Sequence, residues 1–144
     1  GANPVWMGER AILAELGSVQ LEFKTLSYHT GNPQYRQKVE QVMDVVRGAA
    51  PDSGLWSTWM DAQTGVFDDN HFTLGAMGDS FYEILLKQWL LTGKKESVYR
   101  TTFQRAAEGI QRDMVFHSRP SGQTYIAELD GARPYQTPFH KMDH

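Results

Sequence analysis

Residues 74–91 combine acidic side chains, glycines and an apolar stripe at a spacing that can support chemistry. Asp79 and Glu83 are one helical turn apart, so a helix here places two like charges on one face. A pair of carboxylates in a polar cleft can act as general acid and base on a hydroxylated substrate. Gly75 and Gly78 precede Asp79 and allow a bend that brings the backbone close to a ligand. The spacing therefore indicates a candidate catalytic element.

The same spacing also has a purely structural interpretation. Asp79 can cap the helix and favour the positive end of its dipole, while Glu83 points into solvent. Two like charges one turn apart then cost only about a few tenths of a kcal/mol. The residues alone leave both interpretations open.

Other residues offer less specific chemistry. Trp56 and Trp59 could stack on sugar rings, although such tryptophans more often pack on a neighbouring helix. His140 and His144 are four residues apart, with Asp143 beside the second, as in a helical zinc site. Such a site would need a further ligand and a helix that two nearby prolines disfavour. We therefore predict no metal site within the chain.

Composition narrows the possible partners. The chain has 144 residues, 40% of them hydrophobic, which is enough for the core of one domain. The net charge of −3 offers no broad basic surface, so nucleic acid is not an expected partner. The sequence has no apolar run of membrane-spanning length and no cysteine for a disulfide framework.

Helical periodicity predicts the elements that hold the candidate residues. We expect helices near residues 18–30, 33–47, 79–91 and 96–117. Ser18 is the predicted N-cap of the first helix, and Val19, Phe23 and Leu26 form its core stripe. A short turn leads to the second helix, which begins at Pro33, so the two should pack as an antiparallel hairpin.

The later helices repeat this arrangement. The third helix has an apolar stripe formed by Phe81, Ile84, Leu85 and Trp89. The fourth helix is expected to end before Pro120 and Gly122. A Thr-Gly pair follows both the first and the third helix, which suggests a degenerate repeat of stacked αα-hairpins.

Short β segments interrupt the helices. Residues 55–60 and 66–74 are rich in β-branched and aromatic side chains and flank turn-forming residues 61–65, so we predict an inserted β-hairpin. Residues 123–128 are predicted to form a further strand. The predicted fold class is therefore mainly α, built from αα-hairpins with a small inserted β-hairpin.

Three blocks of sequence resemble a known family in the same order. They are Gly-Asp-Ser-Phe-Tyr-Glu at residues 78–83, followed by Leu-Leu-Lys at 85–87; residues 18–31; and Lys-Met-Asp-His at 141–144. This set resembles the class I α-1,2-mannosidases, glycoside hydrolase family 47. The resemblance implies an (αα)7 barrel, of which residues 1–144 would be one partial catalytic domain with no second domain. We expect the chain to be an internal fragment of that domain.

The resemblance also implies an activity and a cofactor. Family members remove terminal α-1,2-linked mannose from high-mannose N-glycans, with inversion and with a calcium ion at the barrel base. Inversion uses an acid and a base whose carboxyls are ~6.5 to 9.5 Å apart. Asp79 matches one of the three acidic residues that serve this chemistry. The other two, and the threonine that helps to hold calcium, are expected before Gly1 and after His144, so the fragment itself should be inactive.

The resemblance assigns substrate contacts to several residues. Glu22 and His144 align with residues of the substrate cleft, and Glu83 has a supporting role there. Met77 stands where enzymes of the endoplasmic reticulum type carry an arginine that grips a glycan branch, whereas Golgi-type members have an apolar residue. Ile84 replaces the usual tyrosine. The chain therefore resembles the Golgi type more closely.

The resemblance implies a protein of the secretory-pathway lumen, of the Golgi type, whose membrane anchor would lie outside this stretch. Two other functions remain compatible with the residues. One is a non-catalytic, mannosidase-like protein that binds glycans in quality control. The other is a helical-repeat interaction module in which Asp79 is only a cap.

Overall fold

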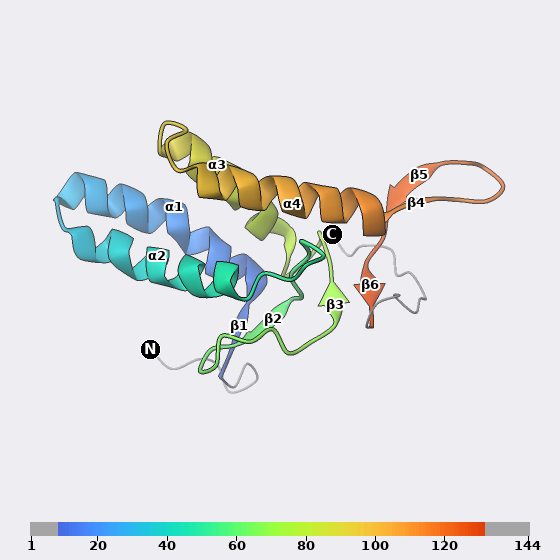
Figure 1. The fold of residues 1–144 in the computed structure, drawn as a ribbon, viewed down its shortest axis with the longest axis horizontal. Helices are drawn as coiled ribbons and strands as arrows, with labels where there is room; N and C mark the ends of the chain where they lie inside the picture. The colour runs from blue at the N-terminus through green and yellow to red at the C-terminus, as the bar shows by residue number, and fades with distance from the viewer. Residues whose placement is uncertain (1–8, 132–144) are drawn as a thin grey trace.

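In a computed structural model, residues 9–131 are described, and four helices form most of this part (Figure 1). The helices are α1 (Leu13–Thr30), α2 (Pro33–Gly48), α3 (Asp79–Leu91) and α4 (Ser97–Asp113). The strands are β1 (Arg10–Ile12), β2 (Trp59–Asp61), β3 (His71–Phe72), β4 (Val115–His117), β5 (Thr124–Ile126) and β6 (Leu129–Asp130). The prediction of a mainly α chain with small β elements is confirmed.

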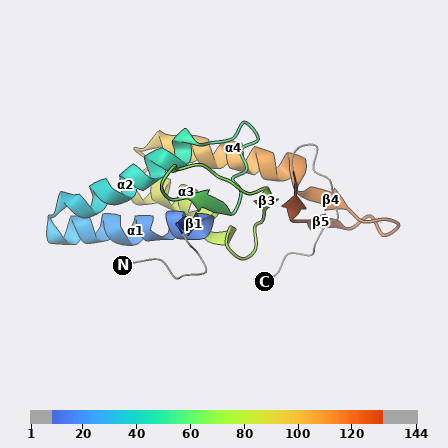
Figure 2. The same ribbon diagram turned by 90° about the horizontal axis from the view of Figure 1, so that it is seen from below.

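The helices form two αα-hairpins that lie side by side (Figure 2). Helix α1 packs against both α2 and α3, and α3 also packs against α4. The Ala14 N–H donates to the Met77 carbonyl at 2.9 Å, which joins the start of α1 to the turn before α3. Thr25 and Leu91, near the other ends of these helices, line one cavity. Helices α1 and α3 therefore run parallel, as neighbouring αα-hairpins require.

Helix α2 follows its sequence signals closely. Pro33 occupies the first turn, and the Asn32 side chain accepts a hydrogen bond from the Gln34 N–H at 3.0 Å. Val39, Met43 and Val46 are buried at helical spacing. The predicted second helix is confirmed to within one residue.

The start of α1 differs from the prediction. The helix begins at Leu13, its N-cap is Ile12, and Ser18 lies inside it with its hydroxyl 3.4 Å from the Glu15 carbonyl. The prediction of Ser18 as N-cap is wrong. The Leu13 N–H donates to the Thr58 carbonyl at 2.9 Å, and the Ala14 N–H is also bonded. Because distant carbonyls satisfy these two N–H groups, they need no side-chain cap.

The buried face of α1 is also not the predicted one. Val19, Phe23 and Leu26 are 37%, 38% and 41% exposed, whereas Gln20 and Lys24 are buried. The Lys24 ammonium donates to the Tyr99 hydroxyl at 2.9 Å and lies 3.6 Å from a carboxylate oxygen of Glu40 and 3.5 Å from one of Glu96.

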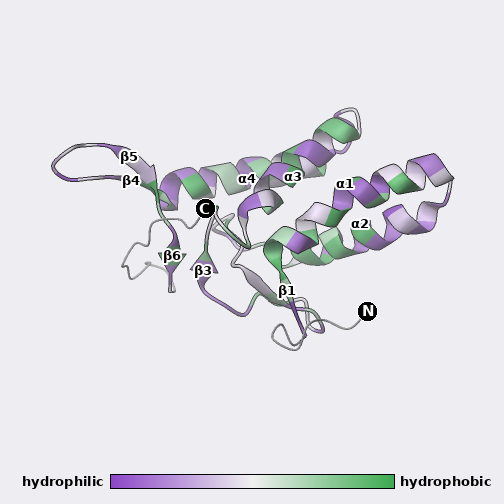
Figure 3. Ribbon diagram, turned by 180° about the vertical axis from the view of Figure 1, so that it is seen from behind, coloured by the Kyte–Doolittle hydropathy of each residue, from purple (hydrophilic) through white to green (hydrophobic). Residues whose placement is uncertain are grey.

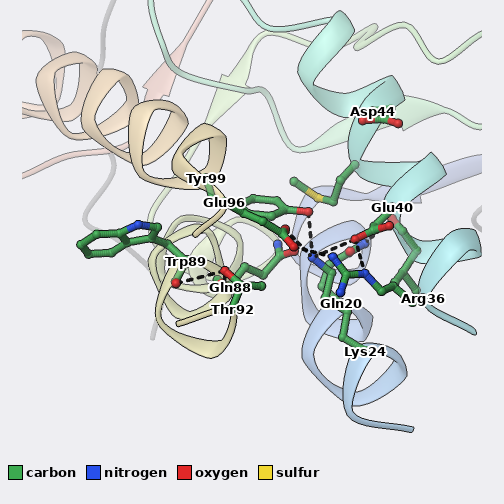
Figure 4. A network of polar contacts seen from close by, with 12 residues as sticks. Gln20, Lys24, Arg36, Glu40, Asp44, Gln88, Trp89, Thr92, Glu96 and Tyr99 are labelled. Carbon is green, nitrogen blue, oxygen red and sulfur yellow. Dashed lines mark hydrogen bonds and ion pairs between the residues drawn. The ribbon is translucent and has the colours of Figure 1, made fainter. Parts of the chain in front are cut away.

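Figure 4 shows this polar cluster between the helices. Arg36 contacts both glutamates, and its hydrogen bond with Glu40 raises its pKa above the usual value. Burial of a lysine is tolerated here because its charge is paired. The interior face of α1 is therefore held by a polar network.

Helix α4 ends at Asp113 and not at residue 117. Residues Val115–His117 instead form β4, which pairs antiparallel with β5. Pro120 and Gly122 lie in the loop of this hairpin (Figure 1). Val115 and Phe116 are β-branched and aromatic, and their cross-strand pairing with Ile126 and Tyr125 replaces the last turn of the predicted helix. The predicted strand at 123–128 is confirmed over Thr124–Ile126.

The predicted hairpin over residues 55–74 does not form as such. Strand β2 pairs with β1, and β3 pairs with β6, both antiparallel. A single bridge between Met60 and Phe67 remains of the expected pairing. The turn itself is present: the Thr64 N–H bonds the Asp61 carboxylate at 2.7 Å, and this hydrogen bond lowers the pKa of Asp61. The strand partners come from distant segments that local patterns do not reveal.

The main core lies between the two hairpins. Its fully buried members include Leu13, Met43, Val46, Trp56, Phe81 and Leu85. Trp56 is 2% exposed and its Nε1–H donates to the Val46 carbonyl at 3.0 Å, so it packs in the core and cannot stack on a sugar. Figure 3 shows apolar and polar residues distributed around each helix. Within residues 9–131, no helix is both long and apolar enough to span a membrane.

Candidate active site

Asp79 is the first residue of α3 and is exposed. Its N–H donates to the Gly75 carbonyl at 2.9 Å, and its Oδ1 accepts a hydrogen bond from the Ser80 N–H at 2.7 Å. The N-cap residue is Gly78, so the interpretation of Asp79 as a side-chain cap is wrong. The carboxylate does lie at the positive end of the helix, which stabilises its negative charge. The Asp79 backbone is therefore fixed by a hydrogen bond, while its carboxylate is open to solvent.

A tight turn delivers Asp79. Met77 adopts a φ of 73°, a left-handed conformation that costs a non-glycine residue about 1–3 kcal/mol. A Cβ on Gly78 would lie 2.4 Å from the Thr73 carbonyl oxygen, so only glycine fits there. The Met77 carbonyl accepts the Ala14 N–H, which anchors the turn to α1. The predicted glycine bend is confirmed, and its close contact is with the Thr73 backbone.

Glu83 lies one turn after Asp79 and is exposed. The Lys87 ammonium is 2.9 Å from a Glu83 carboxylate oxygen, at a spacing of four residues. This ion pair offsets the repulsion between the two carboxylates on α3. Glu83 is thus available at the surface, beside a positive charge.

Glu22 is exposed on α1. A Cβ on Gly17 would lie 3.2 Å from the Phe81 Cα, so these two residues are level on the parallel helices. At a rise of about 1.5 Å per residue, Glu22 lies about 4.5 Å further along the axis than Glu83, and about 10 Å further than Asp79. Among residues 9–131, no hydrogen bond or ion pair joins Glu22 to either carboxylate. The three acidic residues are thus exposed at successive heights along two adjacent helices.

Met77 and His144 are the remaining predicted site residues. Met77 is 37% exposed at the turn before Asp79. His144, like His140, lies outside the described residues. Within residues 9–131, no group of three or more histidine and acidic side chains is arranged to hold a metal ion. Calcium takes six to eight oxygen ligands, so the described residues do not fit such a site.

A set of polar residues behind the turn was missed from the sequence. The Glu128 carboxylate is buried and accepts a hydrogen bond from the Thr73 hydroxyl at 2.6 Å. His71 Nδ1 lies 2.7 Å from the Asp130 carboxylate, and its Nε2 lies 3.8 Å from that of Glu128. These contacts arise from pairing of β3 with β6, whose residues are far apart in the chain. The only local signal was an acidic residue at the end of a predicted strand.

Comparison with known proteins identifies the family. The sequence matches glycosyl hydrolase family 47 over residues 2–144. The chain belongs to this family. The family 47 resemblance of the three sequence blocks is thereby confirmed, and a glycoside hydrolase is the class of enzyme to which the chain is related.

Relatives of this family 47 chain are mannosidases by name. Over 137 residues it is 39% identical to mannosyl-oligosaccharide alpha-1,2-mannosidase IA of Drosophila melanogaster, covering 95% of this chain and 20% of that protein. It is 37% identical over 143 residues to the human endoplasmic reticulum mannosyl-oligosaccharide 1,2-alpha-mannosidase, covering 98% of this chain and 20% of that protein. The chain spans about a fifth of the length of these relatives.

A solved structure has a similar fold. The alpha-1,2-mannosidase from Trichoderma reesei matches with a TM-score of 0.78 and 28% sequence identity, over 86% of this chain and 27% of that one. The paired helices of this family 47 chain therefore have the arrangement of part of a known mannosidase.

Proposed function

We propose that the protein containing this chain is a mannosyl-oligosaccharide 1,2-α-mannosidase, which hydrolyses terminal α-1,2-linked mannose from high-mannose N-glycans. The observation that supports this most directly is the exposed Asp79 carboxylate at the N-terminus of α3, in a chain that belongs to family 47. A helix N-terminus stabilises negative charge, and the backbone bonds fix the carboxylate without covering it.

Asp79 is proposed as one of the carboxyl groups of an inverting hydrolysis. In such a reaction one carboxylic acid protonates the leaving oxygen and a carboxylate removes a proton from the attacking water. Glu22 and Glu83 are about 10 and 6 Å along the helix axis from Asp79, and their exposed oxygens can accept hydrogen bonds from mannose hydroxyls. We assign them, with His144, to substrate binding.

Calcium dependence is proposed for the whole protein, with ligands other than residues 9–131. The proposed compartment is the lumen of the secretory pathway, where N-glycans are processed. Relatives named as type IA and as the endoplasmic reticulum enzyme match this chain at similar identity. Our proposal of the Golgi type therefore rests on Met77.

The central test is Asp79→Asn in the protein that carries this chain. The change is nearly isosteric and preserves the helix start, but an amide cannot act as a general acid or base. We expect turnover on a high-mannose glycan to fall by about a hundred- to ten-thousandfold, with unchanged circular dichroism. Asp52→Asn, at an exposed loop position, is the matched control.

Unchanged turnover in Asp79→Asn would remove Asp79 from the mechanism. Glycan binding by the unsubstituted protein without mannose release would instead indicate the non-catalytic, glycan-binding function. The 144-residue chain alone is expected to release no mannose, because the other two catalytic acids of the family are expected outside it.

Met77 is the residue from which we propose the branch specificity of the protein. Its side chain has no hydrogen-bond donor, and it is 37% exposed beside Asp79. Arginine at this position could hold one glycan branch through several donors. We therefore expect the protein to trim several α-1,2-mannoses in succession and Met77→Arg to favour one eight-mannose product. A product time course on a nine-mannose glycan tests this, and a single product from the unsubstituted protein would contradict it.

A further inference from the structure

Glu128 is a buried carboxylate with a specific partner. It is 9% exposed, and its Oε1 accepts a hydrogen bond from the Thr73 hydroxyl at 2.6 Å. Burial of a carboxylate is costly unless hydrogen bonds compensate for the lost water. Pairing of Leu129 in β6 with Phe72 in β3 places Glu128 beside Thr73. The sheet thus brings a charged group to the residue where the turn before α3 begins.

Thr73 connects Glu128 to the backbone of the turn. Its hydroxyl donates to Glu128 and accepts a hydrogen bond from the Gly75 N–H at 2.8 Å. A hydroxyl polarised by a carboxylate is a stronger acceptor, because consecutive hydrogen bonds reinforce each other. The Gly75 carbonyl in turn accepts the Asp79 N–H at 2.9 Å. Hydrogen bonds on both sides of Gly75 therefore connect Glu128, through Thr73 and the Gly75 backbone, to the N–H of Asp79.

The turn needs such support. Met77 has a φ of 73°, and Gly78 passes so close to the Thr73 carbonyl that a Cβ would lie 2.4 Å from it. Strained conformations of this kind persist only where the surrounding structure fixes them. One support is the Ala14 N–H, which donates to the Met77 carbonyl at 2.9 Å. The Thr73 hydroxyl is the support at the other end.

We propose that Glu128 and Thr73 are positioning residues, which fix the turn at residues 73–78 and thereby the place of the Asp79 carboxylate. The consequence for catalysis rests on the proposed function of Asp79. His71 faces Glu128 from the same strand pair, with its Nε2 at 3.8 Å, and its Nδ1 contacts Asp130. The role is distinct from substrate contact, because Glu128 and Thr73 are both buried.

The first experiment measures hydrogen exchange by mass spectrometry on peptides covering residues 74–80, in the protein that carries this chain. Thr73→Val keeps the side-chain shape and removes the hydroxyl. We expect exchange in these peptides to become at least about tenfold faster, with exchange in residues 82–90 unchanged. Thr73→Ser retains the hydroxyl and should restore the original rate, and the nearly isosteric Glu128→Gln should give an intermediate rate.

Thr58→Val is the matched control. Thr58 and Thr73 are both 1% exposed, and the Thr58 hydroxyl also donates to a carboxylate, that of Asp69, at 2.6 Å. Its hydrogen bond does not touch the turn, so the control should leave residues 74–80 unchanged. Equal acceleration in the control, or no acceleration in Thr73→Val and Glu128→Gln, would overturn the proposal.

The second experiment measures steady-state mannose release by the same variants. A misplaced carboxylate lowers the rate of the chemical step, so kcat of Thr73→Val should fall about ten- to a hundredfold with little change in KM. Thr73→Ser should recover kcat, and Thr58→Val should retain it. Unchanged kcat despite faster exchange would overturn the positioning role. If the unsubstituted protein releases no mannose, the proposed function fails, while the exchange experiment still decides whether these residues fix the turn.

Discussion

Helices α1 and α3 run parallel and touch each other, yet most buried side chains of α3 are apolar, whereas the side chains buried beyond the first turns of α1 are polar. Helix α3 buries Phe81, Ile84 and Leu85, the apolar stripe expected from its sequence. Helix α1 buries Gln20 and Lys24 and leaves its apolar stripe more than a third exposed. An apolar stripe thus predicts burial only where a neighbouring element offers apolar contacts. On α1 the neighbours offer two glutamates and a tyrosine.

Leu85→Ala should have the largest effect on stability. Leu85 is fully buried in the core between the hairpins, so its truncation removes apolar contacts and leaves a cavity. We expect the free energy of unfolding to fall by about 2–5 kcal/mol. Urea denaturation of the 144-residue chain measures this. A loss below about 1 kcal/mol would show that the apolar face of α3 is not tightly packed in the core.

Lys24→Met should have the next largest effect. The substitution keeps much of the apolar stem but removes the charge that contacts Tyr99, Glu40 and Glu96. Removal of one member of a buried pair can cost about 3–5 kcal/mol. Here both glutamates keep Arg36 as a partner and are partly exposed, so we expect about 1–2 kcal/mol.

Lys87→Met on α3 is the control for Lys24→Met, because it removes a lysine charge from the surface and not from a buried network. Lys87 pairs with Glu83 at the surface, and both side chains are more than half exposed. Surface ion pairs of this kind contribute little, so the expected loss is below about 0.5 kcal/mol. Equal losses at Lys24 and Lys87 would mean that the buried network of α1 adds no more than a surface pair.

The comparison also shows which parts of the fold a sequence can predict. Helix α2 has a local signal at its start, Asn32 before Pro33, and a regular apolar stripe, and its prediction succeeded. Helix α1 starts at Leu13 because its first N–H groups bond carbonyls of Thr58 and Met77, which lie far along the chain. The prediction of strand pairing was wrong for the same reason. The pairs β1–β2 and β3–β6 each join segments that are distant in the sequence.

The candidate site divides in the same way. Asp79 and Glu83 lie within one motif, and the glycines before them indicate the turn, so the sequence alone makes both residues candidates. Glu128 and Thr73 are 55 residues apart and meet only through a two-residue strand pair. No local pattern encodes that contact. A motif can therefore point to the exposed carboxylate but not to the groups that hold it in place.

Gln88→Leu should stabilise the chain. Gln88 is fully buried on α3, and within the described residues neither its Nε2 nor its Oε1 has a hydrogen-bond partner. Replacement of an unsatisfied buried amide by an apolar group of similar size removes its desolvation penalty. We expect a gain of about 1 kcal/mol in the free energy of unfolding, measured by the urea midpoint. A loss would indicate that the Gln88 amide is satisfied in solution and that α3 too depends on polar contacts.

A small effect is expected for Leu26→Ala, the counterpart on α1 of Leu85→Ala. Both substitutions remove the same atoms from a helix, and alanine and leucine have similar helix propensities. Leu26 is 41% exposed and lies opposite the buried Lys24 network, so its truncation leaves no enclosed cavity. Only the apolar area already removed from water is lost, and we expect a change below about 1 kcal/mol. The urea midpoints of the two variants, measured side by side in the 144-residue chain, test the comparison directly. If Leu26→Ala costs as much as Leu85→Ala, the apolar stripe of α1 is buried in solution, and the sequence-based prediction of that face was right after all.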